Sequence, residues 1–217
     1  MAAQVKSKVE VPALVAQRRA QIVEAAIELF GRRGYHVTTM REVAQRAGVS
    51  VGLIYQYVED KEDVLFLALL EVLDSYMREL PAALQGLADP LERFRAAVQA
   101  YGRVIDRKID ATVLAYVETK SLRRERREMI KQKEVETNQL ISACITDCIA
   151  AGLFEPVDVE MLTHEIVMLC HAWALKAWRY RGRMALDEYL ARGLGVLLGA
   201  VLTGAGARRY AVGPASP

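Results

Sequence analysis

Apolar residues recur along this chain at helical spacing. In residues 13–33, Ile22, Val23, Ala26 and Phe30 fall one, three or four positions apart and share one face of a helix. Later segments repeat this spacing. No stretch shows the strict two-residue alternation between turn residues that marks a half-buried strand. The pattern therefore predicts an all-α protein.

The expected helices are separated by capping residues, glycines and prolines, which set their ends. Gly34 follows the first helix, Asp89-Pro90 opens another, and a break is expected at residues 152–156. The helices are expected at residues 13–33, 39–47, 51–58, 61–80, 90–107, 110–120, 121–151, 158–181 and 185–204.

The second and third of these helices are short and joined by a tight turn. Thr39 and Glu42 have the spacing of a capping box, and Gly48 suits the left-handed conformation of the turn. Ser50 and Asp60 are in position to cap the next two helices. Braced by the first helix, this arrangement predicts a helix-turn-helix, although a three-helix bundle without DNA binding would share the spacing.

The helical pattern suggests three parts. We expect residues 1–12 to be a flexible arm and residues 13–61 to be a three-helix, helix-turn-helix DNA-binding domain. Residues 62–217 are expected to form a second, helical domain.

Composition indicates a globular chain. Of 217 residues, 53% are hydrophobic and 26% charged, which excludes a disordered class. The net charge is only +2, but the first 58 residues hold eight Lys and Arg against four Glu, a balance of +4. This mild basic bias agrees with a nucleic-acid partner at that end.

Sequence features favour the cytoplasm. The N-terminus has no apolar leader, and the longest uncharged apolar stretch, Gly193 to Ala207, is short for a membrane span. Three cysteines suit a reducing compartment. Cys144 and Cys148, with His164 or His171, offer a metal or redox alternative, but two small buried hydrophobes fit better. We expect no metal and no cofactor.

An enzyme is not expected. The chain has neither a G-x-x-x-x-G-K-[ST] phosphate loop nor an H-E-x-x-H zinc motif, and its three histidines have no ligand spacing. A helical adaptor that binds protein instead of DNA is the remaining alternative class. It would leave the capping box and the paired tyrosines Tyr55 and Tyr57 unexplained.

One segment resembles a known family. Residues 38–65, TTMREVAQRAGVSVGLIYQYVEDKEDVL, are similar to the signature of the TetR family of bacterial transcription repressors. The resemblance is strong over residues 13–65 and limited to length and helical character elsewhere. Val58 replaces a usual Phe, and Val51 and Leu53 replace residues that are often polar, so the resemblance leaves the operator sequence open.

The resemblance implies which residues meet DNA. Ile54 and Val58 should face the domain core, while tyrosine hydroxyls and helix N-termini hold phosphates and apolar side chains touch thymine methyls. Arg41 is the expected guanine reader. Three alternatives remain: Tyr55 packs in the core, Gln56 is only solvated, or Arg41 pairs with Glu42 or Glu59. The expected DNA-binding residues are Thr39, Arg41, Ser50, Val51, Gly52, Leu53, Tyr55, Gln56, Tyr57 and Lys61.

The later helices should hold an effector and a partner subunit. The family resemblance implies that residues 62–217 form an effector-binding and dimerisation domain, with a pocket in the middle helices and a four-helix dimer interface from the last two. The alternatives are an ordinary packed core and a large monomeric core. The expected pocket residues are Tyr101, Ile105, Val113, Tyr116, Val117, Cys144, Cys148, Met168 and His171. The expected interface residues are Trp173, Ala191, Gly195, Leu198, Gly199 and Thr203.

The effector is the most open question. Residues 121–133 carry six basic and two acidic side chains, either as a solvated face or as a basic rim for an anion. Arg123, Arg124, Arg126 and Arg127 are the expected rim. Residues 171–190, HAWALKAWRYRGRMALDEYL, loosely resemble family members that control fatty-acid metabolism. Together these features suggest a repressor released by a fatty acyl-CoA. The alternative is a drug-sensing efflux repressor with an aromatic or cationic effector. The expected partners are double-stranded operator DNA, the effector and a second copy of the chain, without a membrane.

Overall fold

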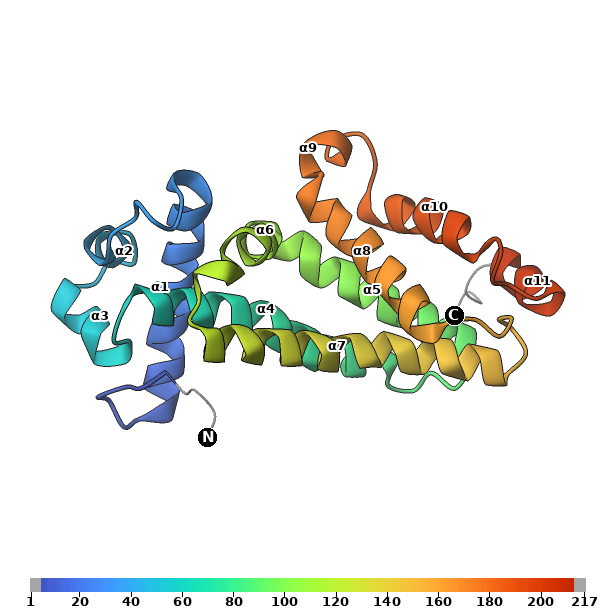
Figure 1. The fold of residues 1–217 in the computed structure, drawn as a ribbon, viewed down its shortest axis with the longest axis horizontal. Helices are drawn as coiled ribbons and strands as arrows, with labels where there is room; N and C mark the ends of the chain where they lie inside the picture. Colours follow the sequence, from blue (N-terminus) through green and yellow to red (C-terminus); the bar gives the residue numbers. More distant parts are fainter. Residues whose placement is uncertain (1–4, 213–217) are drawn as a thin grey trace. The chain divides into compact units, whose positions relative to one another are not determined.

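A computed structural model describes residues 5–212, and these residues confirm the all-α prediction (Figure 1). Among them the only β pairing is an isolated antiparallel bridge between Phe154 and Leu202. The helices are α1 (Pro12–Arg33), α2 (Met40–Arg46), α3 (Val51–Tyr57), α4 (Lys61–Leu84), α5 (Pro90–Arg107), α6 (Ile109–Glu118), the short 3-10 helix η1 (Thr119–Ser121), α7 (Arg124–Ala150), α8 (Val159–Leu175), α9 (Ala177–Tyr180), α10 (Leu186–Leu198) and α11 (Gly204–Val212).

The chain divides into two compact units. The first combines residues up to 73 with residues 108–132, and the second combines residues 74–107 with those from 133 onward. The expected domain boundary at residue 61 is the start of α4, and α4 and α7 each contribute residues to both units.

Local capping sets the helix-turn-helix in the first unit. The Thr39 hydroxyl accepts from the Glu42 N–H at 3.3 Å, and the Thr39 N–H donates to Oε2 of Glu42 at 2.8 Å, as the capping box predicts. Gly48 has a φ of 67°, a conformation that favours glycine. Ser50 accepts from the Leu53 N–H at 3.2 Å. The expected turn and helix starts are therefore confirmed.

The segment before α1 differs from the expected flexible arm. Residues 1–4 lie outside the described residues, but residues 5–11 are held against the first unit. Val5 is buried, and the Lys8 N–H donates to the Gln56 carbonyl at 2.8 Å. Tertiary hydrogen bonds that sequence patterns do not reveal therefore order this segment.

The second unit is built around α5, whose buried face carries Phe94, Val98, Tyr101 and Ile105. α5 packs against α8 and α10, which also pack against each other. The approach to α10 is close at Gly102, because an added Cβ would lie 2.7 Å from Cδ1 of Leu190. In the described residues, no helix is long and apolar enough to cross a membrane.

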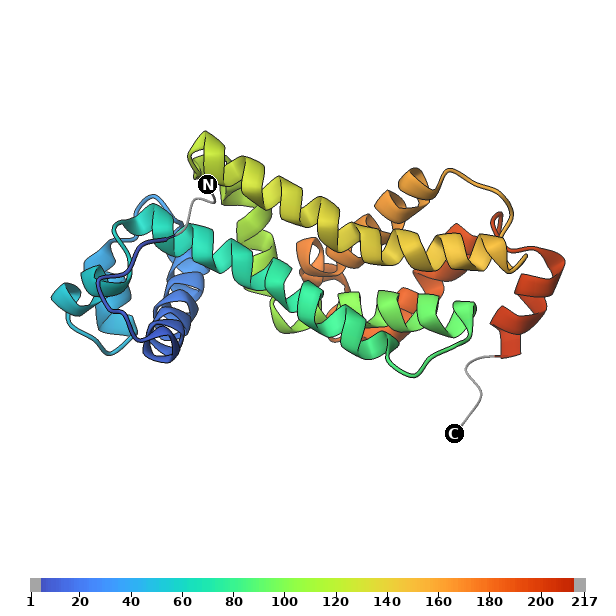
Figure 2. The ribbon, with the colours of Figure 1, turned by 90° about the horizontal axis from the view of Figure 1, so that it is seen from below.

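The C-terminal helices are shorter than expected. The helix expected over 158–181 ends at Leu175 and resumes as α9, and the one expected over 185–204 ends at Leu198. After α10 the backbone pairs with the loop that follows α7: the Glu155 N–H donates to the Val201 carbonyl at 2.8 Å, and the Thr203 N–H donates to the Leu153 carbonyl at 3.0 Å (Figure 2). This pairing interrupts the helix.

The unexpected helix α11 begins just beyond this pairing. The Thr203 hydroxyl accepts from the Gly206 N–H at 3.0 Å and so caps the helix. A Cβ on Gly206 would lie 2.0 Å from the Leu153 carbonyl oxygen, so only glycine fits the close approach. Thr203, expected to continue the small-residue stripe of the preceding helix, instead starts a new one.

Candidate nucleic-acid interface and ligand-binding core

One face of α3 is open and the opposite face is buried. Ile54 is fully buried and Tyr57 is 3% exposed, so both belong to the core of the helix-turn-helix. The open face carries Val51, Gly52, Tyr55 and Gln56, and Leu53 lies at its margin. Tyr57 was expected to reach DNA, but its burial places it with the core because it lies three positions from Ile54.

Arg41 is the exposed cation of α2. No hydrogen bond or ion pair to its guanidinium occurs within the described residues, so the expected alternatives, Glu42 and Glu59, are not its partners. Glu42 instead pairs with Arg33 at 2.5 Å. Thr39 is also exposed, but its hydroxyl already donates to Glu42 at 2.9 Å. Arg41 therefore keeps its donors available, whereas Thr39 uses its donor for the cap.

Lys61 does not have the environment of a phosphate contact. Its ammonium donates to the carbonyls of Tyr35 (2.8 Å), His36 (3.1 Å) and Thr38 (2.9 Å), and it lies 4.5 Å from the centre of the Tyr35 ring. Burial lowers the pKa of Lys61. All three donors of the ammonium are used, so Lys61 fastens the loop between α1 and α2 to the start of α4.

Most of the basic residues near α3 are neutralised. Arg32 and Arg46 pair with Glu28, and Arg33 pairs with Glu42. Arg18 donates to the side chain of Gln21 at 2.9 Å, and Arg19 donates to three main-chain carbonyls. Of the eight basic residues in the first 58, three have no side-chain partner within residues 5–212: Lys6, Lys8 and Arg41.

The letters of residues 48–52, Gly-Val-Ser-Val-Gly, also match G-x-S-x-G. That motif presents a nucleophilic serine when it turns a strand into a helix. Here the segment joins two helices, and the Ser50 oxygen accepts from the Leu53 N–H. Ser50 is therefore a helix cap in this chain.

The expected basic rim is partly engaged. Arg126 is buried and binds Asp63, which is 1% exposed, while Arg123 binds Asp60 at 2.9 Å and Glu62 at 3.0 Å. These ion pairs join the start of α7 to the start of α4. Arg123 and Arg126 therefore cannot hold an anionic ligand without breaking pairs, which removes half of the expected rim.

The expected pocket residues fall into two groups. In the first unit, Val113 is half-buried, and Tyr116 and Val117 are 46% and 50% exposed on α6. In the second unit, Tyr101, Ile105 and His171 are buried and Met168 is half-buried, and the Tyr101 hydroxyl lies 3.1 Å from Nε2 of His171. Cys144 and Cys148 are also buried, but Cys148 contacts Pro90 at the start of α5, about three helical turns from Tyr101. The second group provides the candidate ligand-binding core.

The cysteines of the second unit are protonated thiols. Burial raises the pKa of Cys144, and it raises the pKa of Cys148 and Cys170 to about 12. The Cys148 thiol lies 3.3 Å from the Pro90 carbonyl, to which it donates. No cluster of three or more potential metal ligands occurs among the described residues. Because the thiolate is the reactive form, these residues act as small apolar side chains.

A polar cluster lies inside the apolar second unit. The rings of Tyr76 and Tyr101 stack at 4.0 Å, and the Tyr101 hydroxyl lies 3.1 Å from Nε2 of His171. Burial lowers the pKa of His171 to about 4, so the imidazole is neutral at pH 7. Partial burial of its carboxyl raises the pKa of nearby Glu134, a residue that is exposed on α7. No sequence pattern pointed to Tyr76 or Glu134, since only tertiary packing brings them to Tyr101.

The small-residue stripe of α10 is open within this chain. Ala191, Gly195 and Gly199 are exposed, and nothing lies within 4 Å of a Cβ added to Gly195. By contrast, Trp173 and Leu198 are buried, and the Trp173 indole donates to Asp106 at 2.8 Å. Trp173 and Leu198, expected at the interface, are therefore core residues of the subunit.

Two exposed apolar residues, one on α9 and one on α10, were missed. Trp178 on α9 is 78% exposed and Val196 on α10 is 82% exposed. The helical stripe that contains Trp178 was visible in the sequence, but the break at Lys176 decides where that side chain lies. Together with the glycines of α10, they are apolar surface that the described residues do not cover.

Comparisons with known proteins agree with this architecture. The profile of the tetR family of bacterial regulatory proteins matches residues 22–68, and that of the tetracyclin repressor-like C-terminal domain matches residues 87–201. The HTH-type transcriptional regulator HbdR of Aromatoleum sp. (strain CIB) is 48% identical over 212 residues, which cover 98% of this chain and 93% of HbdR.

Solved structures have the same fold. A tetR-family regulatory protein from Rhodococcus RHA1 superposes with a TM-score of 0.77 at 26% identity, covering 87% of this chain and 98% of that one. The crystal structure of AibR in complex with isovaleryl coenzyme A and operator DNA has a TM-score of 0.71 at 23% identity, covering 82% and 97%. The chain therefore belongs to the TetR family of bacterial regulators and is a DNA-binding transcriptional regulator, not an enzyme.

Proposed function

We propose that this regulator is a cytoplasmic homodimer that binds a near-palindromic operator and represses transcription until a small molecule releases it. The open face of α3, from Val51 to Gln56, is the observation that carries the proposal. A two-fold dimer would present two such faces to successive major grooves on one side of the duplex.

The uncharged α3 can bind DNA because other elements supply the positive charge. Val51 and Leu53 offer apolar contacts to thymine methyls, and Gly52 lets the backbone come near a base edge. Arg41 on α2 can donate two hydrogen bonds to a guanine. Tyr55 and Gln56 are exposed and can donate to phosphate oxygens.

The dimer is supported by the apolar face of α9 and α10. Trp178 on α9 and Val196 on α10 are exposed, and so are Gly195 and Gly199, whose small size lets two helices approach closely. A large exposed apolar patch is usual at a protein–protein interface.

The operator is tested with DNA from upstream of the protein's own gene. Fluorescence anisotropy should show binding to a near-palindromic fragment, with affinity that falls steeply as salt rises, because phosphate contacts release counterions. Sedimentation should show a dimer at micromolar concentration. Salt-independent affinity, or a monomer that binds the operator, would contradict the proposal.

For the effector we propose an acyl-CoA. The second unit offers an apolar interior with neutral hydrogen-bonding groups at Tyr101 and His171, which suit an acyl chain with a carbonyl. AibR, which shares the fold, binds isovaleryl coenzyme A. Of the expected basic rim, Arg124 and Arg127 of the first unit have no ion pair within the described residues and keep their charge available for an anion, unlike Arg123 and Arg126.

Glu134 favours a second candidate, a cationic aromatic effector. Its carboxyl, whose pKa is raised by partial burial, lies close enough to Tyr101 to affect the Tyr101 pKa, and a bound cation would stabilise its charged form. This assignment would make the protein a drug-responsive repressor of the same family.

Titrating each candidate effector into the protein–operator complex distinguishes the two proposals. Acyl-CoAs of increasing chain length should release DNA at decreasing concentrations, with about 1–3 kcal/mol of coupling. Release should weaken in the Arg124→Gln/Arg127→Gln variant and persist in Glu134→Gln. Release by cationic aromatics instead, lost in Glu134→Gln, would replace the acyl-CoA assignment. If CoA esters act equally on both variants, residues 121–133 are a solvated face only.

A further inference from the structure

The segment before α1 has the alternation of an extended strand. Val5 is buried, Ser7 and Val9 are half-buried, and Lys6 and Lys8 between them are exposed. One side of the segment therefore packs on the first unit while the other carries two ammonium groups into solvent.

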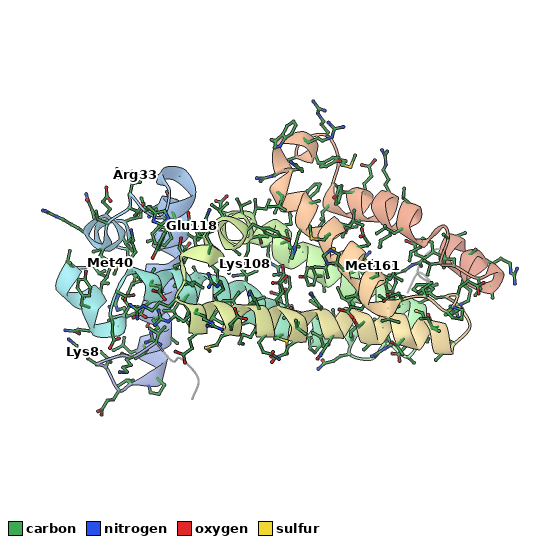
Figure 3. The ribbon with its side chains drawn as sticks, in the orientation of Figure 1. Lys8, Arg33, Met40, Lys108, Glu118 and Met161 are labelled. Carbon is green, nitrogen blue, oxygen red and sulfur yellow. The ribbon has the colours of Figure 1, made fainter. Side chains whose placement is uncertain are left out.

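This segment is fastened to the C-terminal end of α3. The Lys8 N–H donates to the Gln56 carbonyl at 2.8 Å, and the Ser7 hydroxyl donates to the same oxygen at 3.2 Å. These bonds satisfy a carbonyl that the end of a helix would leave without a partner. Lys8 consequently lies beside α3, below it in the view of Figure 3.

Arg19 of α1 completes the anchor. Its guanidinium donates to the Val5 carbonyl at 2.6 Å, to the Lys6 carbonyl at 3.0 Å and to the Tyr57 carbonyl at 2.9 Å. The segment and the last turn of α3 thus share one donor group. A planar guanidinium holds several acceptors in a fixed geometry, which limits the positions that the segment can take.

The anchored segment supplies positive charge that the neighbouring face of α3 lacks. The open face of α3 has no cation, and most basic side chains around it are neutralised by Glu28 or Glu42 or used by main-chain carbonyls. Lys6 and Lys8 have no side-chain partner among the described residues. They are positioned next to Gln56, at the end of the face proposed to enter the major groove.

From this arrangement we infer that Lys6 and Lys8 form a second DNA contact, in which their ammonium groups bind backbone phosphates beside the groove that α3 enters. The inference rests on the proposed operator binding. Lysine ammonium groups act as point charges for phosphate and lack the bidentate geometry for reading bases. The contact therefore adds affinity without sequence preference, whereas the α3 face and Arg41 read the sequence.

The test is the variant Lys6→Gln/Lys8→Gln, in which both side chains are exposed and the main-chain anchor is kept. If all four lysines of a dimer contact phosphate, the slope of log Kobs against log salt should become shallower by about 3 to 4. The ratio of operator to random-DNA affinity should stay unchanged. The matched control, Lys131→Gln/Lys176→Gln, removes the same charge from exposed positions on other elements and should leave the slope unchanged.

Failure of this inference differs from failure of the proposed function. If wild-type protein binds no operator, the proposed function fails. If wild-type protein binds the operator and Lys6→Gln/Lys8→Gln keeps the wild-type salt slope, the inferred phosphate contact of Lys6 and Lys8 is wrong. It is also wrong if the control variant reduces the salt slope by the same amount.

A double-mutant cycle tests the anchor. In an Arg19→Gln background the segment loses its fixed position, so the lysine substitutions should reduce affinity less than in the wild type. Full additivity of the two changes would overturn the claim that the anchor positions the lysines.

Discussion

The hydroxyl of Tyr101 lies 3.1 Å from Nε2 of His171 in the interior of the second unit, and neither group is charged at pH 7. Burial raises the pKa of the Tyr101 hydroxyl and lowers that of the His171 imidazole, because both charged forms lose their hydration. An uncharged donor–acceptor pair in an apolar core is suited to a neutral polar group of a ligand, and it also makes the fold sensitive to acid.

His171 should make stability depend on pH. Its pKa is about 4 in the folded chain and about 6.5 in the unfolded chain. The unfolded state therefore binds more protons in this window, and stability falls as pH drops from about 6.5 to 4, by at most about 3 kcal/mol. Urea unfolding followed by circular dichroism should show this slope in wild type and a weaker one in His171→Gln. The exposed His164→Gln should keep the wild-type slope, and equal slopes in wild type and His171→Gln would refute the assignment.

Arg41 and Tyr55 should affect DNA binding differently. Arg41→Ala should relax the preference at one base pair by about 1–3 kcal/mol, because a bidentate guanine contact is lost. Tyr55→Phe removes only a hydroxyl and should weaken binding to all sequences by about 1 kcal/mol. Selection of operators from random DNA measures both. An Arg41→Ala variant that selects the wild-type operator would show that another residue reads the base.

Lys61→Met should reduce stability more than DNA affinity. The substitution removes a charged donor from three carbonyls of residues 35–38 and should lower the free energy of unfolding by about 1–3 kcal/mol. Binding by the folded fraction should keep the wild-type salt slope. A slope about 2 smaller for the dimer, with stability unchanged, would return Lys61 to the phosphate contact implied by the family resemblance.

Gly195→Leu should break the dimer. A leucine at the open stripe of α10 would overpack a close helix crossing, typically by 1–3 kcal/mol, and a two-fold interface repeats that effect. Sedimentation should show a monomer with helical content retained, and operator affinity should fall.

Gly193→Leu is the matched control for the dimer prediction. A Cβ on Gly193 would lie 2.4 Å from Cδ1 of Leu169, so the substitution should destabilise packing inside the subunit, with loss of helical content before loss of association. A Gly195→Leu protein that stays dimeric and binds DNA would exclude this stripe from the interface.

The sequence by itself determined the features that depend on near neighbours along the chain. The Thr39–Glu42 capping box, the Gly48 turn and the Ser50 cap join residues no more than three apart, so their letters suffice to identify them. Helical periodicity likewise determined the all-α class, and the signature of residues 38–65 identified the helix-turn-helix and the family.

Only the tertiary structure decided which side chains are available. Lys61 meets carbonyls 23 to 26 residues away, Arg126 meets Asp63 at a separation of 63, and Arg19 reaches Tyr57 at a separation of 38. Hydrogen bonds of this kind depend on how helices pack, which local spacing does not encode. Tertiary contacts also determine where α10 ends. The chain beyond Leu198 pairs with residues 153–155, and a helix cannot continue through that pairing.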